Sequence, residues 1–220
     1  MRVTDPTRWP PRLLAGLGLL LAAAASTAEE AASPSPEDIC SCLWRGSFVD
    51  VQGEADLVIS GEVVTRKGNS IDVEVDGILR GREFQNPLRI WLQARDYCRP
   101  PADDFPPGSQ WVMALQRIDE VPPGGFDPAT PNISYGRVGD YYLPACGGYW
   151  LQVKGGRVTG NLVEAPRWEH QPKMTPVLLE LVAAFIAGEV DAQALLKASK
   201  EDPALRELML DTKEFLRTAP

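Results

Sequence analysis

The chain has 220 residues, with 22 lysines and arginines against 30 aspartates and glutamates, so its net charge at pH 7 is −8. An acidic chain without a basic cluster is a poor ligand for nucleic acid or anionic lipid, because neither counterion release nor surface attraction favours binding. We therefore expect no nucleic-acid partner. The length fits one domain, or one domain with an appendage.

Residues 1–28 predict a secretory signal peptide. Arg2, Arg8 and Arg12 precede an uncharged apolar run over residues 13–25, and small residues follow it. The run is too short for a transmembrane helix, which needs roughly 20 apolar residues. We expect cleavage, no membrane insertion after it, and a secreted or periplasmic protein, with an uncleaved signal anchor as the alternative. Cleavage removes three arginines and one aspartate and changes the net charge from −8 to −10.

The four cysteines follow a polar, proline-containing segment, residues 29–39, which predicts a disordered leader. Cys40 and Cys42 lie close together, whereas Cys98 and Cys146 stand alone. In an oxidising compartment this pattern predicts two long-range disulfides, because a ring between the first two cysteines would be tight and strained. The alternative is a four-cysteine zinc site, although the spacing lacks the paired knuckles typical of such sites.

The middle of the chain consists of short runs that alternate between apolar and polar residues, which indicates strands. The first two, 55–66 and 70–79, enclose the hairpin-turn sequence Lys67-Gly68-Asn69. The further runs are 88–92, 149–154, 157–162 and 110–117, of which the last is apolar on both faces and so expected to be central, whereas residues 141–143 lead to Cys146. Gly61, inside the first run, predicts a bulge or bend. Short strands with regular turns predict a small barrel or sandwich.

Residues 174–217 predict a helical C-terminal extension. Thr175-Pro176 and Asp202-Pro203 each place an N-capping side chain before a proline at the first helical position. Residues 191–200 can form a short helix between these two. The apolar stripes need a partner, and we expect them to pack on the barrel, with another protein as the alternative.

In chain order, the sequence resembles the N-terminal domain of tissue inhibitors of metalloproteinases and the wider netrin-like domain family over about residues 40–165. The resemblance is carried by Cys40-Ser41-Cys42, by ADLVISGEV, IDVEVDGILRG and PGSQWVMAL, and by the single cysteines at 98 and 146. It implies a mainly β fold with a five-stranded OB-fold-like barrel. It also implies that two disulfides, Cys40–Cys98 and Cys42–Cys146, join the N-terminal segment to this barrel. The cysteine-rich second subdomain of those inhibitors is absent from the C-terminal extension.

The resemblance also implies a protein-binding function. In those inhibitors the first cysteine is the mature N-terminus, its amino group and carbonyl chelate the zinc of the protease, and the next side chain enters the specificity pocket. The matching positions are Cys40 and Ser41. Signal cleavage would leave about a dozen residues before Cys40, and a peptide amide nitrogen is a poor zinc ligand. We therefore expect an exported module that binds an unknown protein partner. The alternative is an inhibitor of a zinc metalloprotease, acting through an N-terminus trimmed to Cys40.

Three segments are candidate contact surfaces for a partner. Alternation in the third strand predicts an exposed Trp91, and the loops over 99–108 and 121–139 are rich in proline and glycine. The alternative is that these segments are ordinary surface without a binding role, because single exposed aromatic residues and connecting loops are common.

Enzymatic activity is not expected. The chain has one histidine, His170, so any Ser-His-Asp or Cys-His mechanism would depend on it, and a site with two histidines is impossible. Asp103 and Asp104 offer two carboxylates, whereas Ca²⁺ prefers more oxygen ligands than two. We therefore expect no catalytic residue, no cofactor and no metal, with a weak Ca²⁺ site or an enzyme that depends on His170 as less favoured alternatives.

Overall fold

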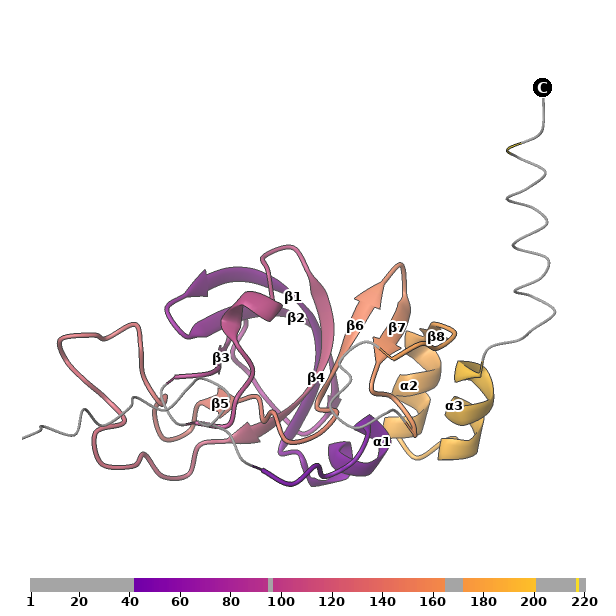
Figure 1. Cartoon of the computed structure of the whole chain (residues 1–220), viewed down its shortest axis with the longest axis horizontal. Helices are drawn as coiled ribbons and strands as arrows, with labels where there is room; N and C mark the ends of the chain where they lie inside the picture. The colour runs from indigo at the N-terminus through magenta and orange to yellow at the C-terminus, as the bar shows by residue number, and fades with distance from the viewer. Residues whose placement is uncertain (1–41, 95–96, 165–171, 201–216, 218–220) are drawn as a thin grey trace, which may run out of the picture. The chain divides into compact units, whose positions relative to one another are not determined.

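The computed structural model describes residues 42–94, 97–164, 172–200 and 217, which all belong to one compact unit, 34–220 (Figure 1). The predicted signal peptide, the leader and the predicted helix after Asp202-Pro203 lie outside the described residues. Within the described ranges, no helix has the length and apolar character needed to cross a membrane.

Five strands close into a barrel. They are β1 (Leu57–Lys67), β2 (Ser70–Arg80), β3 (Leu88–Trp91), β4 (Gln110–Arg117) and β5 (Tyr141–Tyr142). They follow one another in the order β1-β2-β3-β5-β4, and β4 pairs again with β1. The β3–β5 pair is parallel and the other four pairs of the ring are antiparallel. The prediction of a mainly β fold with a five-stranded OB-fold-like barrel is therefore confirmed.

Three more strands extend the sheet beyond β4: β6 (Trp150–Lys154), β7 (Arg157–Gly160) and β8 (Val177–Leu178). β5 and β6 pair with the same edge of β4, because Tyr142 lies opposite Gln116 and Trp150 lies opposite Met113. Tyr142 and Trp150 are therefore eight positions apart in the sequence, whereas their partners in β4, Gln116 and Met113, are only three positions apart. The surplus leaves the sheet as the loop over residues 143–149, which carries Cys146.

The hairpin between β1 and β2 follows the sequence pattern. Ile71 and Val73 are buried and Glu74 is exposed, as the alternation predicts. Gly68 in the turn has a φ of 61°, a left-handed conformation that glycine adopts readily. The register of β1 against β2 shifts next to Gly61, which confirms the predicted bulge.

Short helices precede and follow the strands of the barrel, and one 3₁₀ turn lies between β3 and β4. They are α1 (Phe48–Val51), the 3₁₀ turns η1 (Gln52–Glu54) and η2 (Ala102–Asp104), α2 (Leu179–Ile186) and α3 (Ala192–Ser199). The predicted helix start at Thr175-Pro176 is wrong, because Val177 pairs with Val158 of β7 and the helix begins at Leu179. The predicted helix over 191–200 is confirmed, and the side chain of Asp191 caps it by accepting a hydrogen bond from the Ala194 amide at 3.1 Å.

A single hydrophobic core joins the barrel and the helices. Val182 and Ile186 of α2 and Leu195 of α3 belong to the same buried cluster as the barrel strands. Figure 1 shows α2 and α3 beside β7 and β8. The described helices of the extension therefore pack on the barrel, as the apolar stripes predict.

Candidate functional site

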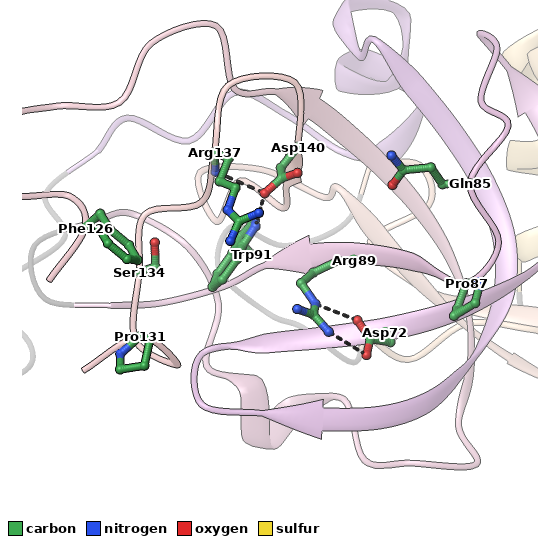
Figure 2. A pocket seen from close by; sticks show the side chains of 10 residues that line it. All are labelled: Asp72, Gln85, Pro87, Arg89, Trp91, Phe126, Pro131, Ser134, Arg137 and Asp140. Atoms are coloured by element: carbon green, nitrogen blue, oxygen red, sulfur yellow. Dashed lines mark hydrogen bonds and ion pairs between the residues drawn. The ribbon is translucent and has the colours of Figure 1, made fainter. Parts of the chain in front are cut away.

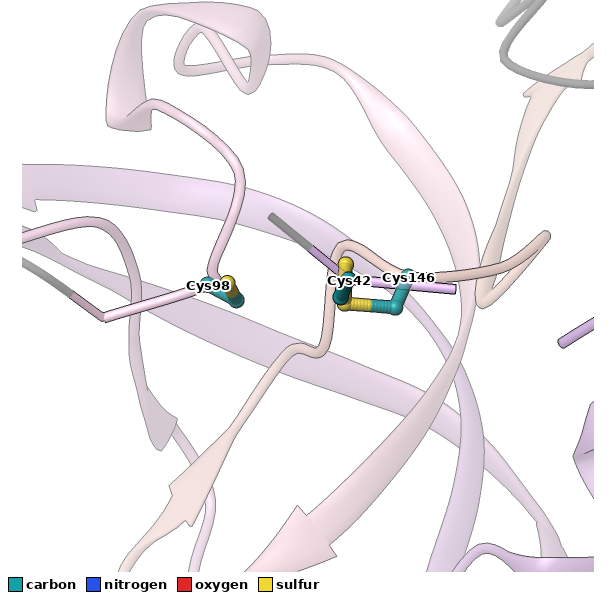
Figure 3. Close-up of side chains that lie close together, drawn as sticks. All are labelled: Cys42, Cys98 and Cys146. Atoms are coloured by element: carbon teal, nitrogen blue, oxygen red, sulfur yellow. A yellow bond between two sulfur atoms is a disulfide. The ribbon is translucent and has the colours of Figure 1, made fainter. Parts of the chain in front are cut away.

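Three of the four cysteines, Cys42, Cys98 and Cys146, lie close together (Figure 3). Cys42 and Cys146 form a disulfide with 5.8 Å between their Cα atoms, which is one of the two bonds implied by the resemblance. The sulfur of Cys98 lies within 4.8 Å of both of their sulfurs (Figure 3). Cys98 is also disulfide-bonded, and its expected partner, Cys40, lies outside the described residues.

These sulfurs do not form a zinc site. Within the described ranges, Cys42, Cys98 and Cys146 are the only cluster of histidine, cysteine or acidic side chains close enough to hold a metal. A zinc ligand is a thiolate, and a sulfur in a disulfide has no thiolate to offer. Asp103, one of the two carboxylates considered above for Ca²⁺, forms an ion pair with Arg66.

Backbone hydrogen bonds join the three segments around the cysteines, which we call the disulfide edge (residues 42–45, 97–99 and 143–146). The amide of Arg45 donates to the carbonyl of Cys146 at 2.8 Å, and the amide of Ala145 donates to the carbonyl of Cys98 at 3.1 Å. Leu43 lies between the disulfide and the first of these bonds, and it is 83% exposed. The disulfide edge therefore presents a large apolar side chain from a segment that is fixed on both sides.

A hollow of about 680 Å³ adjoins the disulfide edge, and we call it the Arg99 hollow. Arg99 is 4% exposed, and its guanidinium carbon lies 4.2 Å from the ring centre of Tyr135, 4.4 Å from that of Tyr142 and 5.5 Å from that of Tyr97. Its Nη1 atom donates to the Tyr135 carbonyl at 2.6 Å, whereas Nη2 is buried without a hydrogen-bond partner. Burial lowers the pKa of Arg99, because desolvation disfavours the charged form.

A second hollow, of about 420 Å³, lies against β2, β3 and the loop over residues 118–140 (Figure 2). Arg89 of β3 donates two hydrogen bonds to the carboxylate of Asp72 of β2, from Nε at 2.7 Å and from Nη2 at 2.9 Å. These bonds are the main reason why the pKa of Asp72 is lowered. Phe126 and Arg137 of the loop line the same hollow.

Trp91 lies at the wall of this second hollow, and the prediction that it is exposed is wrong. It is only 7% exposed, because the loop over residues 118–140 folds against its ring. A Cβ atom added to Gly136 would lie 2.6 Å from the Trp91 ring, which shows how closely the backbone of the loop approaches. The indole nitrogen of Trp91 donates to the carboxylate of Asp140 at 2.7 Å.

The remaining candidates are two loops that the structure describes and three single residues that lie outside the described ranges. Of the candidate loops, 121–139 lines the second hollow with Phe126, and 99–108 begins at the buried Arg99. Cys40, Ser41 and His170 lie outside the described residues. The buried arginine and its three tyrosines were missed from the sequence, because these tyrosines come from positions 97, 135 and 142, with no common motif.

The described residues thus form a closed β-barrel with a disulfide, and its surface carries the Arg99 hollow and the second hollow. No protein-family model, curated protein or solved structure matches the chain at a significant level. Membership of the netrin-like family therefore stays a prediction.

Proposed function

We propose that this protein is an exported module that binds a protein partner through the disulfide edge. The observation that carries this proposal is the 83% exposure of Leu43, next to the Cys42–Cys146 bond. A large apolar side chain on a fixed segment loses little conformational entropy on binding, which favours its use as an anchor at the centre of an interface.

Two features support export. Residues 1–28 have the charged start, the apolar run and the small residues of a signal peptide. The Cys42–Cys146 disulfide is of the kind that persists in oxidising compartments. The non-reduced intact mass of the protein, recovered after export from its natural host, tests both the cleavage and the disulfides. A full-length mass with free thiols would contradict the proposal.

Site-specific photo-crosslinking tests the binding surface. A photoreactive residue at position 43, in protein exported by its natural host, is expected to form one dominant crosslinked species. An excess of unlabelled wild-type protein should compete this species away, whereas an excess of Leu43→Asp should not, because it has lost the anchor. Phe84→Asp is the matched control, because Phe84 is 96% exposed and lies outside the disulfide edge. Phe84→Asp should compete as well as the wild type, and if Leu43→Asp competes while Phe84→Asp does not, the surface is wrongly assigned. If no species crosslinks, binding at this edge is disproved.

Inhibition of a zinc metalloprotease is a second candidate. It is favoured by the position of Cys98 beside the Cys42–Cys146 bond, which is the arrangement that the resemblance implies for an inhibitory N-terminus. The chemistry requires a free amino group on Cys40, because a peptide nitrogen does not chelate zinc usefully.

Two forms of the protein separate this candidate from binding alone. A form that begins at Cys40 is expected to inhibit a zinc metalloprotease, and a form that begins at Glu29 is expected not to inhibit it. Acetylation of the Cys40 amino group should abolish the inhibition. Equal activity of the two forms would rule out chelation, and an absence of inhibition by both across a panel of zinc metalloproteases would remove this candidate.

A further inference from the structure

The Arg99 hollow is an electrostatic exception in an acidic protein. Two arginines, Arg45 and Arg99, line it, and none of its described lining residues is acidic, although the chain as a whole carries a net charge of −8. Arg45 forms an ion pair with Glu54 at the surface. Arg99 takes part in none of the ion pairs of the described residues.

The charge of Arg99 is only partly compensated. Contacts with aromatic rings stabilise a buried guanidinium, and Arg99 has three tyrosine rings within 5.5 Å. A buried donor without an acceptor nevertheless destabilises the protein, and a charged donor does so more. The Nη2 atom of Arg99 is such a donor.

A second unpartnered group lines the same hollow. The hydroxyl of Tyr149 is buried, and its proton has no acceptor among the described residues, since the neighbouring Arg45 guanidinium can only donate. Burial raises the pKa of Tyr149, so the hydroxyl stays protonated and able to donate. The hydroxyl of Tyr142, in contrast, donates to Gln116 at 2.6 Å. Two unpartnered buried donors on one hollow indicate an absent acceptor, since buried polar groups are nearly always paired.

We propose that the Arg99 hollow binds a carboxylate. One oxygen accepts a hydrogen bond from Nη2 of Arg99 and the other from the hydroxyl of Tyr149, and Arg45 adds positive charge at the rim. Two free donors match the two oxygens of one carboxylate. A phosphate dianion fits less well, because Nη1 of Arg99 is already bound to the Tyr135 carbonyl and the net charge of the protein repels a second negative charge.

Leu43 lines the same hollow, so the carboxylate site adjoins the apolar anchor of the disulfide edge. A partner that covers Leu43 would place a carboxylate in the hollow, from an acidic side chain or from its C-terminus. This assignment of the partner rests on the proposed function. The carboxylate site itself does not, because a small carboxylate can occupy it without a partner.

The test uses the exported full chain labelled with ¹⁵N and follows the side-chain N–H signal of Arg99 by NMR at constant ionic strength. One probe is N-acetyl-glutamate N-methylamide, which carries a side-chain carboxylate, and the other is N-acetyl-leucine, which carries a terminal carboxylate. The amide counterparts, N-acetyl-glutamine N-methylamide and N-acetyl-leucinamide, are the controls. A saturable shift with a carboxylate and none with its amide is expected, and the tighter probe identifies the source.

Variants of the protein assign the donors. Tyr149→Phe removes only the hydroxyl and is expected to weaken binding about tenfold, the effect of losing one hydrogen bond to a charged group. Arg45→Gln should weaken binding several-fold. Arg66→Gln is the matched control, because Arg66 forms a surface ion pair with Asp103 away from the hollow, and it should change nothing.

Three results would overturn the carboxylate site. These are equal shifts with carboxylates and amides, a shift that never saturates, or unchanged affinity in Tyr149→Phe. These results test the carboxylate site, whereas the crosslinking experiment tests the proposed function, and the two can fail independently. Carboxylate binding without a crosslink at position 43 would keep this site and disprove the proposed function, and a crosslink without carboxylate binding would do the reverse.

Discussion

At the scale of single residues, Asn69 fixes the loop over residues 118–140 to the turn between β1 and β2. It is 6% exposed, and its amide nitrogen donates to the carbonyls of Leu92 at 3.0 Å and Ser134 at 2.8 Å. Its side-chain oxygen accepts from the Ser134 amide at 2.8 Å. Because this loop walls the second hollow, the geometry of that hollow depends on one buried amide.

We predict that Asn69→Ala destabilises the protein by about 2–4 kcal/mol, because it leaves buried backbone groups without partners. Chemical denaturation measures the loss, and hydrogen exchange of the Ser134 amide should accelerate with it. Asn132→Ala is the control, since Asn132 is an exposed residue of the same loop. A loss below about 1 kcal/mol for Asn69→Ala would show that water replaces the bonds.

The Asp72–Arg89 pair predicts a dependence of stability on pH. The pKa of Asp72 is lowered in the folded protein, chiefly by the hydrogen bonds from Arg89. The pair therefore stabilises the fold above the ordinary pKa of 3.8, and this contribution is lost as the pH falls through the lower folded-state value. Asp72→Asn should cost about 0.5–1 kcal/mol at pH 7, the usual range for a partly exposed pair.

The measurement is chemical denaturation of the wild type and of Asp72→Asn across the acid range. The two curves should converge as the pH falls below the folded-state pKa of Asp72, where the carboxylate is protonated in both states. Asp76→Asn, an exposed position on the same strand, should lower stability less at neutral pH. Parallel curves for wild type and Asp72→Asn would contradict the assignment of the ion pair.

Two residues show why the site is harder to predict than the strands. Alternation within β3 places the side chain of Trp91 on the face opposite to that of the buried Ile90. Without a loop over that face, Trp91 would be exposed to solvent. Its burial depends on Gly136, far along the chain. Arg99 follows a cysteine in a polar loop, and its burial depends on tyrosines from three separate segments. Periodicity reports the neighbours within a strand, not the loops that later cover it.

At the scale of elements, Gly61 allows β1 to bend against β2. A Cβ atom at this position would lie 2.4 Å from the carbonyl oxygen of Glu74 and 2.7 Å from Cγ1 of Val73. Gly61→Ala should therefore cost about 1–3 kcal/mol, because the backbone of β2 has to move. Gly53→Ala is the control, since its nearest heavy atom would be 3.9 Å away. If the two variants had equal denaturation midpoints, β2 would be free to shift.

The two helix starts of the extension show where local signals are sufficient. Asp191 caps α3 as predicted, because its side chain bonds to the Ala194 amide within the same turn. The similar signal at Thr175-Pro176 failed, because the edge of β7 offered backbone partners to Val177 and Leu178. A β-branched residue beside an open sheet edge can pair there before a helix begins, and the local sequence does not show that edge.

At the scale of the whole molecule, the sequence predicted most of the strands but not the pairing that closes them into a barrel. The four longer strands of the barrel were identified from β-branched residues, alternation or a continuous apolar run, and the resemblance supplied the five-stranded OB-fold-like barrel. The two-residue β5 has too little sequence to reveal that Ile90 pairs in parallel with Tyr141, the contact that completes the ring. Pairing between distant segments depends on the entire sheet.

The shared core makes a prediction about cooperativity. Ile186 of α2 is 5% exposed and belongs to the same cluster as the barrel strands. Ile186→Ala should cost about 2–4 kcal/mol and shift a single unfolding transition seen equally by fluorescence and by circular dichroism. Leu178→Ala, at a position that is 49% exposed, should cost less than about 1 kcal/mol. A separate early helical transition would show that the extension unfolds independently of the barrel.

The Cys42–Cys146 disulfide should contribute to both global and local stability. It closes a loop with a sequence separation of 104, which on the chain-entropy model corresponds to about 4–5 kcal/mol, and we expect the double variant Cys42→Ala, Cys146→Ala to lose about 2–5 kcal/mol. The local effect should be largest at the disulfide edge, where the Arg45 amide bonds to the Cys146 carbonyl. Hydrogen exchange should therefore accelerate more at Arg45 than at Val63, whose amide bonds to Ser109. Equal acceleration at both amides would mean that the bond stabilises the barrel as a whole without fixing the segment that carries Leu43, and the proposed anchor would lose its physical basis.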